Sequence, residues 1–157
     1  FCEDKLGVKA VITADKNEEE MRKVSAVLAL CKSKPLNLAG RLSLKQTVAL
    51  SKRSLMFVGV DTAIMHIAAA NDVPVVALFG PSNAQEWGAW DNALNESGYT
   101  RKSGNQNMGR HTVFQKDWEC VSCEKAGCND TRISRCLIEF SKDEIDKIKQ
   151  KIREKIQ

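Results

Sequence analysis

Two continuous apolar runs, residues 55–60 and 74–79, form the clearest hydrophobic pattern in the chain. Neither run alternates apolar with polar residues, which is typical of parallel strands buried on both faces of a sheet. Residues 62–71 between them predict a short helix that opens at Asp61. Ligands of open α/β sheets bind where strands end and helices begin. We therefore expect Asp61, Thr62, His66 and the Gly80-Pro81-Ser82 turn to share one rim of the domain.

The same alternation of strand and helix extends toward the start of the chain. Strands are predicted over residues 7–14 and 36–38, and helices over 18–32 and 43–52. The last of these helices opens with a capping-box pattern, in which a serine is followed three residues later by a glutamine. Strand and helix alternate four times, with spacings that suit parallel crossovers. The pattern predicts an α/β fold, a Rossmann-like three-layer αβα domain with a parallel sheet.

The second half of the chain has weaker signals. Residues 82–110 are rich in Asn, Ser, Gly and charged side chains without periodicity, so we expect a long surface loop. One more strand over 111–115 and a cysteine-rich loop over 118–136 follow. A second capping box opens a closing helix over 141–155, whose isoleucines recur at helical spacing. We interpret the basic opposite face of this helix as a solvated surface.

Composition narrows the function classes. The 157 residues carry 28 % charged and 43 % hydrophobic side chains, an ordinary balance for one domain with its own core. A net charge of +4 is too small to argue for nucleic acid by itself, and it fits an anionic small molecule or an acidic surface partner equally well. The aromatic residues, 6 % of the chain, are not interleaved with basic ones, which argues against a nucleic-acid partner. No apolar run is long enough to span a membrane, and no signal peptide is recognisable. No glycine-rich dinucleotide or Walker loop is present, which disfavours nicotinamide chemistry and ATP hydrolysis.

The start of the predicted 62–71 helix offers anion-binding chemistry. Free amides at a helix N-terminus attract phosphate, and an aspartate there is a good N-cap. Because a carboxylate and a diphosphate repel each other, we assign the phosphates to Thr62 and Ala63, and Asp61 to a hydroxyl or to the amides. Helical spacing places His66 on the same side as Thr62 and Ala63. The alternatives are a plain N-cap at Asp61, a merely exposed or structural His66, and a simple sharp turn at 80–82.

The six cysteines allow two interpretations. Four of them cluster in the second half of the chain, and these are Cys120, Cys123, Cys128 and Cys136. A Cys-x-x-Cys pair suits tetrahedral zinc, but the last two cysteines do not form a second such pair. The α/β pattern indicates the cytosol, where thiols stay reduced, so the spacing alone leaves two possibilities open: a zinc site, and reduced structural thiols or an opportunistic disulfide. The chain also starts at Phe1, without a methionine, in what looks like the end of a helix, so we expect a piece of a larger protein.

The stretch FVGVDTAIMHIAAANDVPVVALFGPS closely resembles the C-terminal domain of the ADP-heptose:lipopolysaccharide heptosyltransferases. These are inverting glycosyltransferases with the two-Rossmann GT-B architecture. The resemblance covers nearly the whole chain, from the glutamate-rich start of the 18–32 helix, through SLKQTVALSKRS, to the cysteine-rich tail ending in Leu137. Its most specific part is D-[ST]-[GA]-x-x-H followed by a strand that ends in F/Y-G-P. Ala63, where many members have glycine, and the cysteine tail are more similar to the core heptosyltransferase III subgroup, which adds the third, branching heptose.

The resemblance implies roles for six residues. Asp61 would contact the heptose or the surroundings of its phosphate, while Thr62 and the Ala63 amide would hold the diphosphate. His66 would stabilise the leaving group by a hydrogen bond or charge. Less securely matched residues are Glu18, for the ribose hydroxyls, and Leu42, for the adenine pocket. Glu18 has a simpler alternative as a solvated glutamate at a helix start.

The resemblance also implies missing parts. The general base and the acceptor site lie in an N-terminal domain that this sequence does not contain, and the donor domain's own first strand and phosphate loop are missing too. We expect ADP-heptose as donor, the lipopolysaccharide inner core as acceptor and no cofactor, and the resemblance favours reduced thiols or an opportunistic disulfide over zinc at the four clustered cysteines. The location would be cytoplasmic, with the cytoplasmic face of the inner membrane as a peripheral site. Alternatives are another GT-B nucleotide-sugar enzyme, such as a different transferase or an epimerase, and a non-catalytic zinc-containing binding module.

Overall fold

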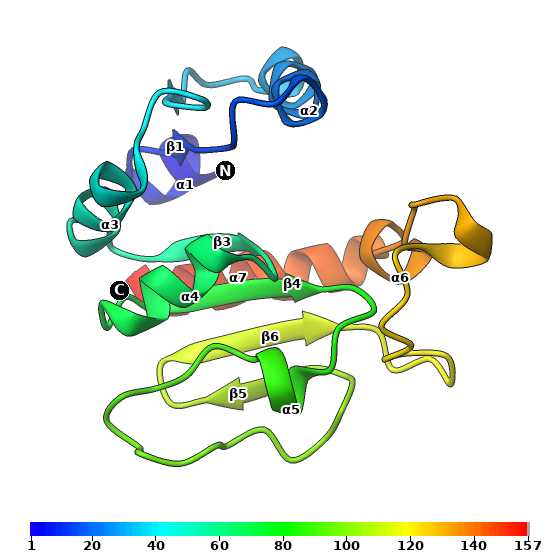
Figure 1. Cartoon of the computed structure of the whole chain (residues 1–157). Helices are drawn as coiled ribbons and strands as arrows, with labels where there is room; N and C mark the ends of the chain where they lie inside the picture. Colours follow the sequence, from blue (N-terminus) through cyan, green and yellow to red (C-terminus); the bar gives the residue numbers. More distant parts are fainter. Residues whose placement is uncertain (157) are drawn as a thin grey trace. The chain divides into compact units, whose positions relative to one another are not determined.

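The computed structural model describes residues 1–156 and contains two compact units, Phe1–Thr47 and a second that begins at Val48. Both units are built from strands and helices (Figure 1). Across the described residues, no helix is long and apolar enough to cross a lipid bilayer.

The first unit contains a small parallel sheet. Its elements are α1 (Cys2–Leu6), β1 (Val11–Ile12), α2 (Glu18–Leu30), β2 (Leu36–Asn37) and the start of α3 (Leu44–Lys52). β1 and β2 are parallel, with Val11 opposite Leu36. The Gly40 amide donates to the Ala14 carbonyl at 2.9 Å, so the two chains stay together beyond their strands. The carboxyl ends of β1 and β2 therefore lie side by side, and the segments leading to α2 and α3 leave from this edge.

The second unit contains a four-stranded sheet in the order β3-β4-β6-β5. Its strands are β3 (Phe57–Val60), β4 (Val75–Phe79), β5 (Gln106–Met108) and β6 (His111–Gln115). β3, β4 and β6 are mutually parallel, whereas β5 is antiparallel to β6. The hairpin between β5 and β6 turns at Gly109, whose φ of +49° lies in the left-handed region that favours glycine.

Helices cover both faces of this sheet. Met65 of α4 (Ala63–Ala70) packs in one core cluster with alternate residues of β4, namely Val75, Ala77 and Phe79. Val76 is also fully buried and faces the opposite side, where α7 (Lys142–Ile156) runs behind the sheet (Figure 1). The predicted α/β fold with a mainly parallel, doubly buried sheet is confirmed.

Both predicted capping boxes are formed. The Ser43 amide donates to Gln46 Oε1 at 2.8 Å, and the Gln46 amide donates back to Ser43 Oγ at 3.3 Å. At the start of α7, the Ser141 amide donates to Glu144 Oε2 at 2.7 Å, and the Glu144 amide donates to Ser141 Oγ at 3.3 Å. Each box satisfies two backbone amides that a helix start would otherwise leave unpaired.

The prediction of a long surface loop over residues 82–110 is wrong. This segment contains α5 (Ala84–Trp87) and β5, and it buries Ala84, Ala89 and Tyr99 in the core next to α4. The Tyr99 hydroxyl donates to the Ala89 carbonyl at 3.0 Å and closes the segment on itself. Its anchors are isolated residues separated by polar ones, so no helix or strand period marks them in the sequence.

The cysteine-rich segment 118–136 is largely irregular, as predicted. It contains a short 3₁₀ turn, η1 (Cys128–Asp130), and leads into α6 (Arg135–Ile138). α6 packs close to the end of β4: a Cβ added at Gly80 would lie 3.3 Å from Leu137 Cβ. The absence of a side chain at Gly80 therefore allows this helix to approach the turn after β4.

Candidate functional site

The turn between β3 and α4 carries the first two predicted site residues, Asp61 and Thr62. Thr62 is the N-cap of α4, with extended backbone (φ −154°, ψ 164°), and among the described residues no side-chain cap bonds the first amides of the helix. The expectation that the helix opens at Asp61 and the alternative of Asp61 as a plain N-cap are therefore wrong, since the cap lies one residue later. As a result the Asp61 carboxylate does not occupy the helix amides.

The start of α4 has the properties of an anion-binding turn. The first amides of any helix have no intrahelical partner, and the helix dipole places partial positive charge there. In α4 no side chain replaces that partner, and both Thr62 and Ala63 are exposed. The Thr62 hydroxyl makes only a long hydrogen bond, 3.4 Å to the Val60 carbonyl. The turn therefore presents backbone N–H groups and a hydroxyl to solvent, a combination that suits a phosphate group.

His66 lies one helical turn further along and faces Asp61. Its Nε2 atom is 3.7 Å from Asp61 Oδ1, which is too long for a hydrogen bond but close enough for an ion pair when the ring is protonated. The His66 side chain is 41 % exposed and that of Asp61 is 22 % exposed. The structure thus brings the carboxylate and the imidazole together at the helix start, as the helical spacing predicts, while Met65 and Ala68 form the buried side of α4.

The Gly80-Pro81-Ser82 turn lies at the same edge of the sheet. β3 and β4 are parallel, with Val60 opposite Leu78, so the residues after each strand emerge side by side. The side chain of Gln115 holds this turn, a role that the sequence pattern did not indicate. The available signal was a glutamine as the last residue of the predicted strand 111–115, and the structure shows every residue of this strand to be buried.

An ion pair between a buried lysine and a half-buried glutamate follows β6 at this edge. Lys116 is 9 % exposed, its Nζ contacts Glu144 Oε2 at 2.5 Å, and it lies between the rings of Trp118 and Phe140. The hydrogen bond from Lys116 lowers the pKa of Glu144 to about 2. The carboxylate therefore stays charged and neutralises the ammonium group, so we assign this lysine to packing rather than to ligand binding.

Glu18 and Leu42 belong to the first unit. Glu18 is exposed and is the first residue of α2, after the Asn17 side chain, which accepts from the Glu20 amide at 2.9 Å. Leu42 is half-buried and follows β2. Both residues therefore follow the carboxyl ends of the paired strands β1 and β2, and their roles stay predictions.

The four clustered cysteines lie in one neighbourhood. Burial raises the pKa of the Cys136 thiol, and Cys128, Cys123 and Cys120 raise it further, which places their sulfur atoms within electrostatic range. All six thiols are free. Among the side chains that the structure describes, no group of three or more His, Cys, Asp or Glu is arranged to hold a metal ion. The zinc alternative therefore has no geometric support, and reduced structural thiols stay a prediction.

The chain is similar in sequence to known heptosyltransferases. It is 32 % identical over 89 residues to lipopolysaccharide heptosyltransferase 3 of Escherichia coli, covering 56 % of this chain and 26 % of the relative. It is 49 % identical over 47 residues to lipopolysaccharide heptosyltransferase 2 of Salmonella typhimurium, covering 30 % and 14 %. The chain thus spans about a quarter or less of the length of these relatives.

A solved structure supports the fold, and a family match assigns the chain. The structure of E. coli ADP-heptose LPS heptosyltransferase II is similar with a TM-score of 0.60 and 19 % identity, covering 93 % of this chain and 37 % of that one. Residues 4–116, more than half of the chain, match the family described as glycosyltransferase family 9 (heptosyltransferase). The chain therefore belongs to glycosyltransferase family 9.

Proposed function

We propose that this chain is the donor-binding part of a longer glycosyltransferase that moves heptose from ADP-heptose to the inner core of lipopolysaccharide. Family membership supports the reaction class. The observation that carries the proposal is the uncapped start of α4, with the Asp61 carboxylate and the His66 imidazole beside it. This arrangement combines an anion site with a hydroxyl acceptor and a hydrogen-bond donor, which are the three groups that a sugar diphosphate requires.

Each residue then has a role that follows from its chemistry. The amide of Ala63 and the amide and hydroxyl of Thr62 would hold the diphosphate. Asp61, which is not engaged with the helix amides, would accept hydrogen bonds from sugar hydroxyls. Glu18 would bind the vicinal ribose hydroxyls, and Leu42 would contact the adenine.

The proposed reaction is a direct displacement at the anomeric carbon. The acceptor oxygen forms a bond to that carbon as the bond to the ADP oxygen breaks, and the acceptor proton passes to a carboxylate in another part of the longer enzyme. ADP leaves with the bonding electron pair. The helix amides and His66 would stabilise the negative charge that develops on the leaving group, so their contribution is greatest in the transition state.

The acceptor sets the proposed location. A lipopolysaccharide inner core is attached to a lipid, so the longer enzyme would meet it at the cytoplasmic face of the inner membrane, as a peripheral protein.

A titration panel tests the donor. We expect ADP and ADP-heptose to bind more tightly than UDP and UDP-linked sugars when each is titrated into the protein by calorimetry. Tighter binding of the uridine ligands would favour another nucleotide-sugar enzyme and contradict the proposal.

A charge-removing variant tests the site itself. Asp61→Asn should lower the affinity for ADP-heptose about tenfold or more, because a charged hydrogen bond to the sugar is lost. The affinity for ADP should stay almost unchanged. Asp143→Asn is the matched control, since Asp143 is exposed on α7 and the charge change is the same. Equal effects of the two variants on ADP-heptose would refute the assignment of Asp61.

A further inference from the structure

The three carbonyls of the Gly80-Pro81-Ser82 turn are all held by donors from distant parts of the chain. Gln115 Nε2 donates to the Gly80 carbonyl at 2.8 Å and to the Ser82 carbonyl at 2.7 Å. The Glu124 amide, from the cysteine-rich segment, donates to the Pro81 carbonyl at 2.9 Å. Turns at strand ends usually rely on local hydrogen bonds, so this degree of support is more than the chain reversal alone requires.

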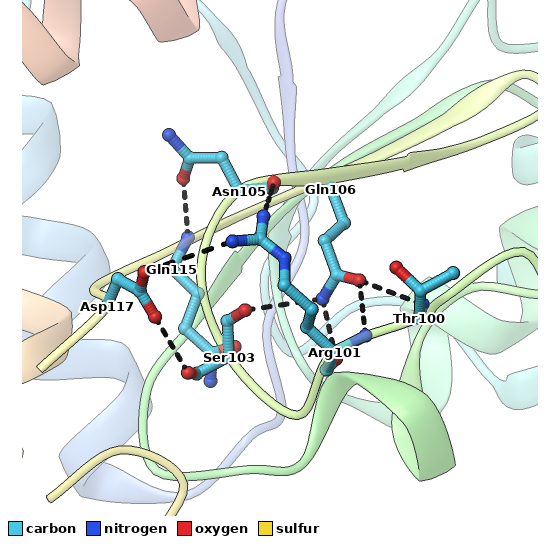
Figure 2. A network of polar contacts seen from close by, with 7 residues as sticks. All are labelled: Thr100, Arg101, Ser103, Asn105, Gln106, Gln115 and Asp117. Atoms are coloured by element: carbon cyan, nitrogen blue, oxygen red, sulfur yellow. Dashed lines mark hydrogen bonds and ion pairs between the residues drawn. The ribbon is translucent and has the colours of Figure 1, made fainter. Parts of the chain in front are cut away.

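Gln115 is itself fixed in place. It is 3 % exposed at the end of β6 and lies opposite Phe79 of β4, the last residue before the turn. Its backbone amide donates to Asn105 Oδ1 at 3.0 Å (Figure 2). The Asn105 carbonyl in turn accepts a hydrogen bond from Arg101 at 2.9 Å.

Asp117, two residues after Gln115, belongs to the same network of polar contacts. Asp117 accepts a hydrogen bond from Ser103 at 3.1 Å and pairs with Arg101 at 3.9 Å (Figure 2). Asn105 and Asp117 therefore hold the strand end that carries Gln115. Gln106 is a second buried glutamine in this segment: it accepts from the amides of Thr100 and Arg101 and donates to the Arg101 carbonyl, and among the described residues it bonds neither to Gln115 nor to the turn.

The orientation of the Gln115 amide is determined by the turn. Both hydrogens of Nε2 are used by the two carbonyls, whereas Oε1 is buried and has no partner among the described residues. A flipped amide would place Oε1 against two carbonyl oxygens. A buried acceptor without a partner destabilises the fold and is rare in native proteins. The arrangement thus accepts one unsatisfied oxygen in return for two bonds that shape the turn.

The turn leaves one polar side chain available at the rim. Ser82 is half-buried, and within residues 1–156 its hydroxyl has no hydrogen-bond partner, because only its carbonyl is engaged. The parallel pairing of β3 and β4 places this turn beside the one that carries Asp61. A sugar or phosphate oxygen bound at the start of α4 would therefore find this hydroxyl on the neighbouring strand end.

We propose that Gln115 is a positioning residue for the sugar-diphosphate site: it holds the Gly80-Pro81-Ser82 turn so that the Ser82 hydroxyl faces the donor. This inference rests on the proposed function. None of the predicted ligand contacts lies on β6, and in this proposal β6 determines the position of the turn at the rim through Gln115. Ser82 becomes a further residue in contact with the sugar-nucleotide.

The test compares two buried glutamines. Gln115→Leu removes the bonds to the turn, and Gln106→Leu is the matched control, since Gln106 is 7 % exposed and also bonds to backbone but not to the turn. We expect both variants to lower the melting temperature. Only Gln115→Leu should raise the Kd for ADP-heptose, and the KM for it in the longer transferase, by about tenfold, the effect of losing roughly one well-placed hydrogen bond.

A second variant keeps the test decisive if Gln115→Leu folds poorly. Ser82→Ala changes a partly exposed side chain and should raise the Kd for ADP-heptose several-fold, on the order of one neutral hydrogen bond. The melting temperature should stay unchanged. Combined with Gln115→Leu it should add little further loss, because both act through the same contact. An unchanged Kd in Ser82→Ala, or equal Kd changes in the two glutamine variants, would overturn the positioning role. Failure of the wild-type protein to bind ADP or ADP-heptose would instead overturn the proposed function.

Discussion

The buried histidine at the opposite end of β6 should make the stability of the second unit depend on pH. His111 is fully buried as the first residue of the strand, and neither of its ring nitrogens has a hydrogen-bond partner of good geometry among the described residues. Burial lowers its pKa to about 4 from an ordinary value of 6.5. The protonated ring is therefore strongly disfavoured in the folded protein.

Charged groups around His111 act in both directions. Lys155 and Arg110 lower the pKa of the ring further, whereas Asp91 and the nearby Trp90 carbonyl raise it, but burial outweighs both. Asp91 is 2 % exposed and accepts from the amides of Arg110 and Ala93, so hydrogen bonds lower its own pKa and keep it charged. The ring is left neutral within a cluster of fixed charges.

The sign of the pH effect follows from proton counting. Between about pH 6.5 and pH 4 the unfolded chain binds a proton at His111 and the folded chain does not, so falling pH favours unfolding. The stabilisation is fully present above the unfolded pKa of 6.5 and is lost as pH falls toward the folded value of about 4. The gap corresponds to about 3 kcal/mol in total, of which about 2 kcal/mol should be lost between about pH 7 and pH 5.

Urea unfolding followed by tryptophan fluorescence measures this loss, because Trp87, Trp90 and Trp118 all lie in the second unit. Keeping the pH at about 5 or above avoids the range in which paired carboxylates such as Glu144 become protonated. His111→Phe should remove the pH dependence in this window. His66→Gln, a change at the other histidine of the chain, should retain it, because it leaves the buried His111 in place. Equal losses in wild type and His111→Phe would refute the reasoning.

Four further outcomes are expected. His66→Ala in the longer transferase should lower kcat on the order of a hundredfold, well beyond its effect on donor affinity, and equal changes in steady-state kinetics and titration would indicate ground-state binding. Gly109→Ala should lower the unfolding free energy by about 2 kcal/mol or more, measured in urea, because φ is +49° and the new Cβ would lie 2.0 Å from Asp91 Oδ2. Ser141→Ala should cost about 1 kcal/mol through loss of the α7 cap, and Ser97→Ala, at an exposed residue, almost nothing in the same assay. The 157 residues alone should bind ADP weakly and transfer no heptose, and elemental analysis should find no stoichiometric zinc; measurable transfer or one bound zinc per chain would contradict these expectations.

The predictable parts of the fold are those in which neighbouring residues share one environment. β3, α4 and β4 could be predicted because their apolar runs are continuous, and both capping boxes because serine and its partner lie three residues apart. The segment over residues 82–110 could not, because Ala84, Ala89 and Tyr99 are buried singly by contacts distant in sequence. Contacts between residues distant in sequence leave no local pattern from which they could be predicted.

The site divides in the same way. Asp61, Thr62 and His66 could be placed together because a strand end and the following helix determine their positions within six residues. The exact cap was misplaced by one residue, since the extended conformation of Thr62 depends on how the chain leaves the sheet. Gln115 could not be connected with the turn at Gly80, 35 positions earlier, because the intervening sequence gives no indication that β6 pairs with β4.

The two ends of β6 carry residues with different effects: His111 on the pH dependence of stability, and Gln115 on the proposed binding site. His111 begins the strand in a buried charged cluster at the amino edge of the sheet, and Gln115 ends it at the carboxyl edge, where the proposed donor site lies. Because His111 and Gln115 share no contact among the described residues and act on different loops, their effects should add independently. His111→Phe should change the pH dependence of unfolding and leave the affinity for ADP-heptose intact. Gln115→Leu should lower the affinity for ADP-heptose and leave the pH dependence of unfolding unchanged. A donor-affinity loss in His111→Phe as large as that in Gln115→Leu would show that the strand transmits any perturbation to the rim, and that Gln115 has no specific role there.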